Sequence, residues 1–466
     1  MNTDPLKIEV LRAPTLCPAI SMSQPFDWGL NPEAETHLQG LLDWFLDKSD
    51  ALYEISKRIE DTTGTRLFDW IDHVRVPTGI ADRKAVQAHG LRAMDRSKVY
   101  RADGTTLFPL LIEDGIPELA LRVSSADAFR KAWSIDDAVE GEPNSAFRKV
   151  TALEEDELRV VAIERRGFLG FEAPEVHDAG DYEDAMRRFE KREREFETKD
   201  DAFADLEEVI SSVAARLSVP RLADAFFRTE IDYWLSRNSA AREQEEVQDE
   251  LGLGLANLDH VTFRSSRPSF KRLMRIMEML GLEPRERFYA GDKAGWGAQV
   301  FESQESGYVV FADFDLTPKE RSIDFASKGL EESEKLGTVG LWVALHGESI
   351  FQAGPHHIAL RFDFDRGRSQ LENEDIGVME PFSDFPFLRQ AFTVGETWKP
   401  DKKRLKESRT SGNLTVEAAE RMQKKDAIGS HLELIERRMG FKGFNQDSVS
   451  VIIKATDPRQ LRSRGA

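Results

Sequence analysis

Hydrophobic positions recur with two different periods along the chain, and each period predicts a different kind of element. Over 33–60 and 178–250, apolar side chains return every three to four positions, which places them on one face of a helix. Shorter apolar or alternating runs, such as 68–76 and 258–264, are typical of strands. The pattern predicts two strand-rich regions, a charged helical span between them, and one N-terminal helix.

The first strand-rich region begins with the strand predicted over 68–76. A helix is predicted over 81–94 and then a hairpin that turns at the Asp-Gly pair 103–104, because Asp-Gly suits a two-residue turn. Further strands are predicted over 119–123 and 158–163.

The second region repeats this order. After the strand over 258–264, a helix is predicted to begin near Pro268 and to end at Gly281, since proline is tolerated in a first turn and glycine often ends a helix. The remaining predicted elements are two hairpin strands over 298–302 and 307–312 and two further strands over 357–362 and 431–435.

Two short strings occur in the same order in both regions. Asp-His-Val stands at 72–74 and at 259–261, and Ile-Glu-Arg-Arg stands at 163–166 and at 435–438. Such self-similarity indicates duplication of one β-α-β unit. Coincidence remains the alternative, because strings rich in Arg and Glu are common.

Composition argues against several kinds of partner. The formal net charge of -20 disfavours nucleic acid and anionic membrane surfaces. The chain has no apolar run of membrane-spanning length and no N-terminal signal-peptide pattern. Because Cys17 is the one cysteine, no intrachain disulfide can form, so a cytoplasmic location is expected by default. A homo-oligomer stays open.

Three residues of the second region form a candidate metal site. Among nine histidines, His260 and His357 each belong to a predicted strand, and a third strand carries Glu433. Two imidazoles and one carboxylate on one face of an octahedral ion leave three positions open, which suits Fe(II). A three-ligand zinc hydrolase and ordinary buried core residues are the alternatives.

The first region lacks this set of residues. In an alignment through the repeated strings, His73 takes the place of the first histidine and Val161 that of the carboxylate. The place of the second histidine falls near Glu118-Leu119, which we interpret as an apolar or neutral position. We therefore expect one metal site, in the second region.

The segments that carry these residues resemble the 4-hydroxyphenylpyruvate dioxygenase family and, more broadly, the vicinal oxygen chelate superfamily. The matching segments are 258–261, 353–360, 432–437 and 440–445. The resemblance implies an α+β fold in which paired β-α-β-β-β modules form two tandem open β-barrels. It also implies that Fe(2+) is held by His260, His357 and Glu433, with another divalent metal as the alternative.

The resemblance implies further residues that would face a substrate. The segment 388–393 looks like the strand that supplies the family with a glutamine and a phenylalanine, here Gln390 and Phe392. Phe441 and Phe444 would then line an aromatic pocket. Ordinary core packing is the alternative for these phenylalanines.

The sequence departs from that family at several places. His356 stands where the family usually has Gln, Arg361 stands where it usually has Asn, and an insertion covers 396–428. Arg264 and Arg361 each follow a proposed ligand histidine by four residues. This spacing is similar to that of the 2-oxoadipate dioxygenase/decarboxylase family, in which an Arg holds a substrate carboxylate.

The resemblance implies an Fe(II)-dependent dioxygenase that oxidatively decarboxylates a 2-oxo acid and hydroxylates the product. Its partners would be that small molecule and O2. An extradiol ring-cleaving dioxygenase, a metal-dependent lyase or isomerase, and an inactive binding protein on the same fold are the alternatives. The expected segments are an N-terminal helical extension over 1–65, a metal-free domain over 66–171, a helical insertion over 172–250 and a catalytic domain over 251–466.

Overall fold

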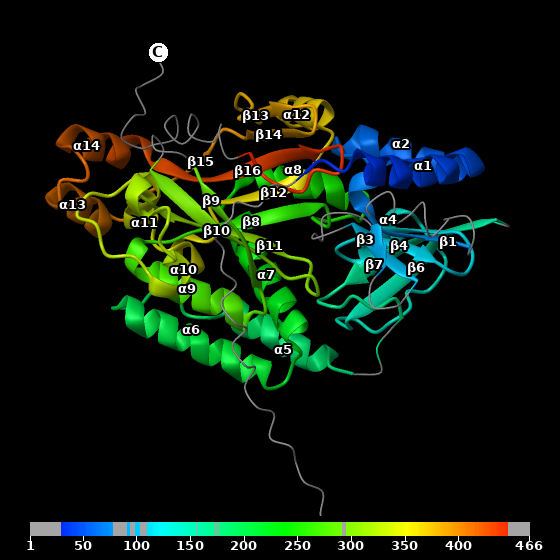
Figure 1. Ribbon diagram of the computed structural model, residues 1–466, viewed down its shortest axis with the longest axis horizontal. Helices are drawn as coiled ribbons and strands as arrows, with labels where there is room; N and C mark the ends of the chain where they lie inside the picture. Colours follow the sequence, from blue (N-terminus) through cyan, green and yellow to red (C-terminus); the bar gives the residue numbers. More distant parts are fainter. Residues whose placement is uncertain are drawn as a thin grey trace, which may run out of the picture.

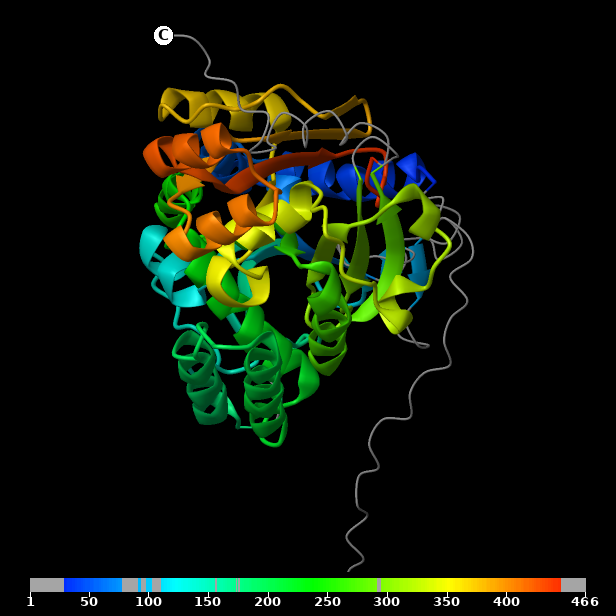
Figure 2. The same ribbon diagram turned by 90° about the vertical axis from the view of Figure 1, so that its left-hand side faces the viewer.

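The computed structural model describes residues 29–77, 91–93, 98–102, 110–155, 157–172, 174, 177–290 and 295–445. Within them the chain forms two curled β-sheets that carry helices on their outer faces (Figure 1; Figure 2). The α+β class that the family resemblance implies is therefore confirmed.

Two helices, not one, precede the first sheet. α1 (Pro32–Lys48) ends at Ser49, and α2 (Asp50–Thr63) begins directly after it. The Ser49 hydroxyl accepts a hydrogen bond from the backbone N–H of Leu52, so this serine caps the second helix while its own backbone is extended. The single helix predicted over 33–60 was wrong at this one residue.

The first sheet has seven strands in the order β2-β3-β4-β1-β5-β7-β6. The strands are β1 (Ile71–Val76), β2 (Leu91–Ala93), β3 (Val99–Ala102), β4 (Leu110–Glu113), β5 (Glu118–Arg122), β6 (Phe147–Glu155) and β7 (Leu158–Arg165). At its centre, β1 runs antiparallel to β5, and β5 runs parallel to β7.

Two local predictions for this region need correction, and others fall on residues that the structure does not describe. The strand expected from residue 68 begins at 71, because 67–70 form a turn of 3-10 helix. Residues 91–93, expected at the end of a helix, form β2. The rest of that helix and the turn at 103–104 lie outside the described residues.

The second sheet has nine strands, eight of them in the order β13-β14-β16-β12-β8-β11-β10-β9, while the ninth, β15, pairs with β16. The strands are β8 (Leu258–Arg264), β9 (Glu283–Tyr289), β10 (Trp296–Glu302), β11 (Val309–Asp315), β12 (His357–Arg361), β13 (Ser383–Phe385), β14 (Leu388–Phe392), β15 (Glu396–Trp398) and β16 (Ala427–Arg437). β10 and β11 form the predicted antiparallel hairpin.

The two sheets follow one plan. β8, β12 and β16 pair with the same directions as β1, β5 and β7. In one sheet His260 faces Ala359, which pairs with Glu433; in the other, His73 faces Ala120, which pairs with Val161. The repeated strings thus occupy equivalent places, so duplication accounts for them better than coincidence. Among the described residues, the module that begins with β5 contributes three strands instead of four.

The chain segment that connects the two sheets is helical. Its helices cover the outer face of the second sheet. The span is formed by α5 (Ala179–Glu190), α6 (Lys199–Ala214), α7 (Val219–Leu235) and α8 (Ser239–Asp249). Phe189, Phe226 and Phe227 of these helices share one buried core with Phe263 and Leu434 of the sheet. Burial of this apolar surface holds the helices against one face of the second sheet. The opposite face of that sheet is available for a site.

The other helices lie within the modules or in the insertion. They are α4 (Ala126–Ala132), α9 (Arg267–Met279), α10 (Phe325–Lys328), α11 (Thr338–His346), α12 (Phe364–Asn373), α13 (Lys402–Thr410) and α14 (Val416–Lys425), with a 3-10 turn at 318–320 and a π-helical turn at 349–353. In the described part of the chain, none of the helices is both long and apolar enough to cross a bilayer.

Glu245 of α8 offers a test of the packing between the helices. Burial, followed by the neighbouring Asp249 and Asp232, raises the pKa of Glu245 to about 7. The folded state therefore binds this proton more tightly than the unfolded chain does. Its contribution to stability is present below the unfolded pKa and is lost as the pH rises through 7.

We expect Glu245→Gln to raise the Tm, measured by differential scanning fluorimetry, more at pH 8 than at pH 5. Glu243→Gln is the control, because Glu243 is exposed on the same helix. An equal change in Tm at both pH values would show that Glu245 is solvated like its neighbour.

Candidate metal centre

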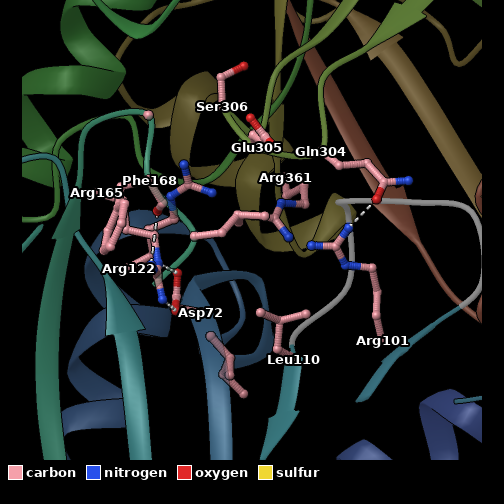
Figure 3. A pocket seen from close by; sticks show the side chains of 14 residues that line it. Asp72, Arg101, Leu110, Arg122, Arg165, Phe168, Gln304, Glu305, Ser306 and Arg361 are labelled. Carbon is pink, nitrogen blue, oxygen red and sulfur yellow. Dashed lines mark hydrogen bonds and ion pairs between the residues drawn. The ribbon is translucent and has the colours of Figure 1, made fainter. Parts of the chain in front are cut away.

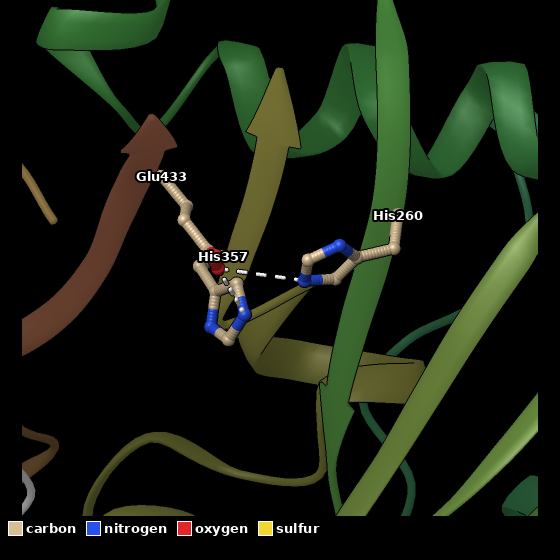
Figure 4. Close-up of side chains that lie close together, drawn as sticks. All are labelled: His260, His357 and Glu433. Atoms are coloured by element: carbon tan, nitrogen blue, oxygen red, sulfur yellow. Dashed lines mark ion pairs between the residues drawn. The ribbon is translucent and has the colours of Figure 1, made fainter. Parts of the chain in front are cut away.

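Three strands of the second sheet bring the predicted ligands together. His260 on β8, His357 on β12 and Glu433 on β16 point toward one another (Figure 4). Glu433 Oε2 lies 3.4 Å from His260 Nε2 and 3.2 Å from His357 Nε2. One ligand atom from each residue lies within 4.8 Å of the other two. Side chains distant in sequence thus form one buried cluster.

The geometry and charge of this cluster suit a divalent ion. With metal–ligand bonds of about 2.1 Å, adjacent donors of an octahedral ion are about 3 Å apart, close to the two separations found. Burial alone would raise the pKa of Glu433, but His260 and His357 outweigh it and hold the pKa at about 2. Burial lowers the pKa of His357. An ionised carboxylate and a neutral imidazole are the forms that bind metal.

His260 competes for a proton in the absence of metal. Burial lowers its pKa, but Glu433 and Asp259 together raise that pKa to about 9. A divalent ion would take the place of this proton between His260 and Glu433. Such competition between protons and metal is general for imidazole ligands.

A buried ion pair orients His260. His260 Nδ1 lies 2.9 Å from Asp259 Oδ1, and Arg437 donates to both oxygens of Asp259 at 2.9 and 3.0 Å. Burial would raise the pKa of Asp259, but Arg437 and His260 keep it well below its usual range. The ionised Asp259 therefore accepts the Nδ1 proton and leaves the lone pair of Nε2 toward the site.

The first sheet holds the same arrangement without the metal ligands. Arg165 donates to both oxygens of Asp72 at 2.7 and 2.9 Å, and His73 Nδ1 lies 2.8 Å from Asp72. The position matching His357 is Glu118, so the apolar or neutral residue expected there was wrong. His73 Nε2 lies 3.6 Å from Glu118. Among the described residues, no group of three potential ligands other than His260, His357 and Glu433 converges on one point.

Two neighbours hold the ring of His357. Thr262 Oγ1 lies 2.8 Å from Nε2, and His356 Nδ1 lies 3.0 Å from His357 Nδ1. Burial, assisted by Arg264, keeps the pKa of His356 well below its usual value. A neutral His356 can accept the Nδ1 proton of His357, which leaves the other ring nitrogen for a metal.

Gln390 and Phe392 also reach the cluster from β14. The Gln390 amide donates to Glu433 Oε1 at 2.7 Å. The ring of Phe392 lies 5.0 Å from the ring of His357. Both residues therefore contact a proposed ligand directly.

The two C-terminal phenylalanines differ in position. The Phe444 ring lies 5.2 Å from that of His260 and 4.5 Å from that of Phe311, which places it beside the cluster. Phe441 instead packs against Phe387, with ring centres 4.8 Å apart. The structure therefore brings Phe444 to the candidate site, whereas Phe441 makes its ring contact with Phe387.

The two arginines proposed to hold a carboxylate are also separated. Arg264 is buried on β8, opposite Asp313 of β11, and its guanidinium carbon lies 5.4 Å from the Trp342 ring. Burial raises the pKa of Asp313 to about 7, although Arg264 acts in the opposite direction. Arg361 lines a different cavity, between the two sheets, together with Asp72.

Sequence reasoning missed the residues that support the ligands. Asp259, Arg437, Thr262 and Asp313 were not singled out as site residues. A signal did exist for the first two, because each stands inside a string that occurs twice. In each sheet, the aspartate of the Asp-His-Val string forms an ion pair with the first arginine of the Ile-Glu-Arg-Arg string.

Comparisons with known proteins found only distant structural likenesses. No family model and no curated protein matches the chain. A variant of 4-hydroxymandelate synthase from Streptomyces coelicolor aligns over 84% of this chain and 98% of its own, with 11% identity and a TM-score of 0.28. Methylmalonyl-CoA epimerase from Mycobacterium tuberculosis aligns over 39% of this chain and 87% of its own, with 14% identity and a TM-score of 0.22.

Likenesses of this size carry no argument about activity. The paired-module architecture of this chain rests on its own strand order and register.

The repeated ion pair provides a matched test of ligand orientation. We expect Asp259→Asn to weaken divalent-metal affinity by about 10- to 100-fold. The reason is that the group that accepts the Nδ1–H hydrogen bond of His260, and so orients its ring, loses its charge. Asp72→Asn makes the same change beside His73 and should leave metal affinity unchanged. Isothermal titration with Fe(II) or Mn(II) under argon measures both. Equal weakening by the two variants would contradict a role specific to His260.

Proposed function

We propose that this chain is a non-haem Fe(II) dioxygenase that oxidatively decarboxylates a 2-oxo acid and hydroxylates the product. The observation that carries the proposal is the buried group of His260, His357 and Glu433, whose ligand atoms face one point. Three protein ligands leave room for a chelating substrate and O2, whereas a structural zinc site is closed by a fourth ligand. When bound, the ferrous ion would supply the redox chemistry for both reactants.

The chain's own residues would set the shape of this site. Gln390 holds Glu433 Oε1, which leaves Oε2 between the two imidazoles. Phe392 and Phe444 cover His357 and His260 with apolar rings. Such walls exclude bulk water from a reactive centre.

Arg264 is the better placed of the two arginines to receive a substrate carboxylate. It is buried and contributes to the low pKa of His356 and of His357, so it lies near the ligand cluster. A guanidinium can donate two parallel hydrogen bonds to a carboxylate. Asp313 beside it would balance part of its charge when the substrate is absent.

The proposal describes an enzyme of small molecules. Its partners would be a 2-oxo acid and O2, and its expected location is the cytoplasm. The reaction requires neither nucleic acid nor membrane, and it sets no condition on the oligomeric state.

The test combines metal analysis with gas exchange. After anaerobic loading with Fe(II), the chain should hold about one iron and consume O2 with release of CO2 when given one of a panel of 2-oxo acids. O2 uptake with catechols and no CO2 would instead indicate ring cleavage, and anaerobic turnover would indicate a lyase or isomerase. Absence of any bound metal would leave a binding protein.

Substitution of the carboxylate ligand should abolish this activity. We expect Glu433→Ala to lose iron and gas exchange while circular dichroism shows an intact fold, because two imidazoles alone bind Fe(II) weakly. Glu433→Gln, which keeps the shape and the contact with Gln390, should behave the same way. His73→Ala is the matched control in the first sheet. Iron lost in His73→Ala but kept in Glu433→Ala would refute the placement of the site.

A further inference from the structure

Asp313 is a buried carboxyl group of the second sheet that the proposed reaction does not use. Its exposed fraction is 3%, and its Oδ1 atom has no hydrogen-bond partner among the described residues. A buried carboxyl oxygen normally has a partner, because burial without one costs free energy. An oxygen left without a partner at this depth indicates that the site receives a hydrogen-bond donor from outside the chain.

Strand alternation places Asp313 on the same face of the sheet as the metal ligands. On β11, Val310 belongs to the core that the helices share with the sheet, whereas the ring of Phe311 lies 4.9 Å from the ring of His260. Successive side chains of a strand point to opposite faces, so Asp313 shares the face of Phe311. Asp313 therefore faces the interior that holds the ligand cluster.

Arg264 stands directly beside Asp313. The two residues are paired in the register of β8 and β11. Arg264 also shares the face of His260, since four residues separate them, and at about 3.3 Å per residue their Cα atoms are about 13 Å apart. A guanidinium group and a carboxyl group thus lie together at one end of the site, and the metal ligands lie at the other.

Arg361 lies away from this end of the site. β12 runs antiparallel to β8, so the four-residue step from His357 to Arg361 runs in the direction opposite to the corresponding step on β8. Figure 3 shows Arg361 instead among the residues that line the cavity between the sheets. Of the two arginines considered for a substrate carboxylate, Arg264 is therefore the one beside Asp313.

The charge around Asp313 favours a cationic ligand group over a neutral one. Burial raises the pKa of Asp313 to about 7, although Arg264 and His260 lower it. A donor with a positive charge would favour the ionised carboxylate and would give Oδ1 a hydrogen bond at the same time. A neutral donor would supply the hydrogen bond alone.

We propose that the substrate ends in an amino-acid group, whose carboxylate binds Arg264 and whose ammonium binds Asp313. The inference rests on the proposed function, because it extends the substrate of the same metal site. The substrate class becomes a 2-oxo acid that chelates the metal at one end and carries an α-amino acid at the other. A substrate with a plain carboxylate at that end would leave Oδ1 of Asp313 without a donor.

Matched probes that differ only in the amino group test this class. One pair is 2-amino-7-oxooctanedioate and 2-oxooctanedioate, and a shorter pair is 2-amino-4-oxopentanedioate and 2-oxopentanedioate. Isothermal titration under argon measures each probe on the full chain loaded with Mn(II), without O2, so that no oxidation occurs. We expect the amino member of at least one pair to bind at least about tenfold more tightly, because Asp313 gains a charged donor.

Equal affinity within both pairs, or tighter binding of the members without the amino group, would overturn the proposal. A further probe, 2-hydroxy-7-oxooctanedioate, carries a neutral donor at the same carbon. If it binds as tightly as the amino compound, the ammonium site is wrong.

These affinities are measured without gas exchange, so they separate the ammonium site from the dioxygenase reaction. Gas exchange with 2-oxo acids decides the reaction, whereas the preference for the amino probe decides this inference. If the chain holds no Mn(II), the proposed function fails, and the same titrations on the metal-free chain still measure the preference.

Two variants locate the preference. Asp313→Asn should lose most of it and should bind 2-oxooctanedioate at least as tightly as the parent does, whereas a general structural defect would weaken both members of the pair. Asp313→Ser provides a second variant if the first one does not fold. A preference retained in a folded Asp313 variant would contradict the assignment.

Asp315→Asn is the matched control on the same strand. The carboxylate of Asp315 already accepts hydrogen bonds from the backbone N–H groups of Gly337 and Val339, at 2.7 and 3.1 Å. This variant should therefore keep the preference for the amino probe.

Discussion

The ion pair between Asp259 and Arg437 is the interaction on which the candidate site depends. It joins β8 to β16 across β12, the strand that lies between them, and it fixes the tautomer and direction of His260. Both partners are buried, so removal of either would leave an uncompensated charge, at a typical cost of about 3–5 kcal/mol. The same pair recurs as Asp72 and Arg165 in the first sheet. Each copy of the duplicated module thus contains an Asp–Arg ion pair that orients the neighbouring histidine.

The two sheets therefore differ at only two of the three equivalent ligand positions, but these two positions decide whether a metal site can form. Glu118 and Val161 stand where His357 and Glu433 stand in the second sheet. Both sheets also keep the glutamate of the Ile-Glu-Arg-Arg string, which accepts a hydrogen bond from the first backbone N–H of α4 in one sheet and of α12 in the other. The scaffold is retained twice, while a complete metal-ligand set occurs once among the described residues.

The sequence allowed much of this to be predicted, because the repeated strings and the strand periodicity reflect local rules. The choice of His260, His357 and Glu433 relied on resemblance, since nothing local shows that three distant strands become neighbours. The contacts that sequence reasoning missed depend on register: Asp259 meets Arg437 only after three strands align. The cavity that Arg361 lines with Asp72 exists only because the two sheets pack together, so the spacing of Arg361 from His357 could not place this arginine there. A helix break at Ser49 was hidden by a continuous apolar stripe.

The central claim is that three side chains of the second sheet hold one divalent ion. Anomalous X-ray diffraction at the iron edge, from crystals of the chain loaded with Fe(II), tests it most directly. The account predicts a single strong peak within about 2.2 Å of Nε2 of His260, Nε2 of His357 and a carboxylate oxygen of Glu433. A peak beside His73 and Glu118, or no ordered peak between the three strands, would contradict it.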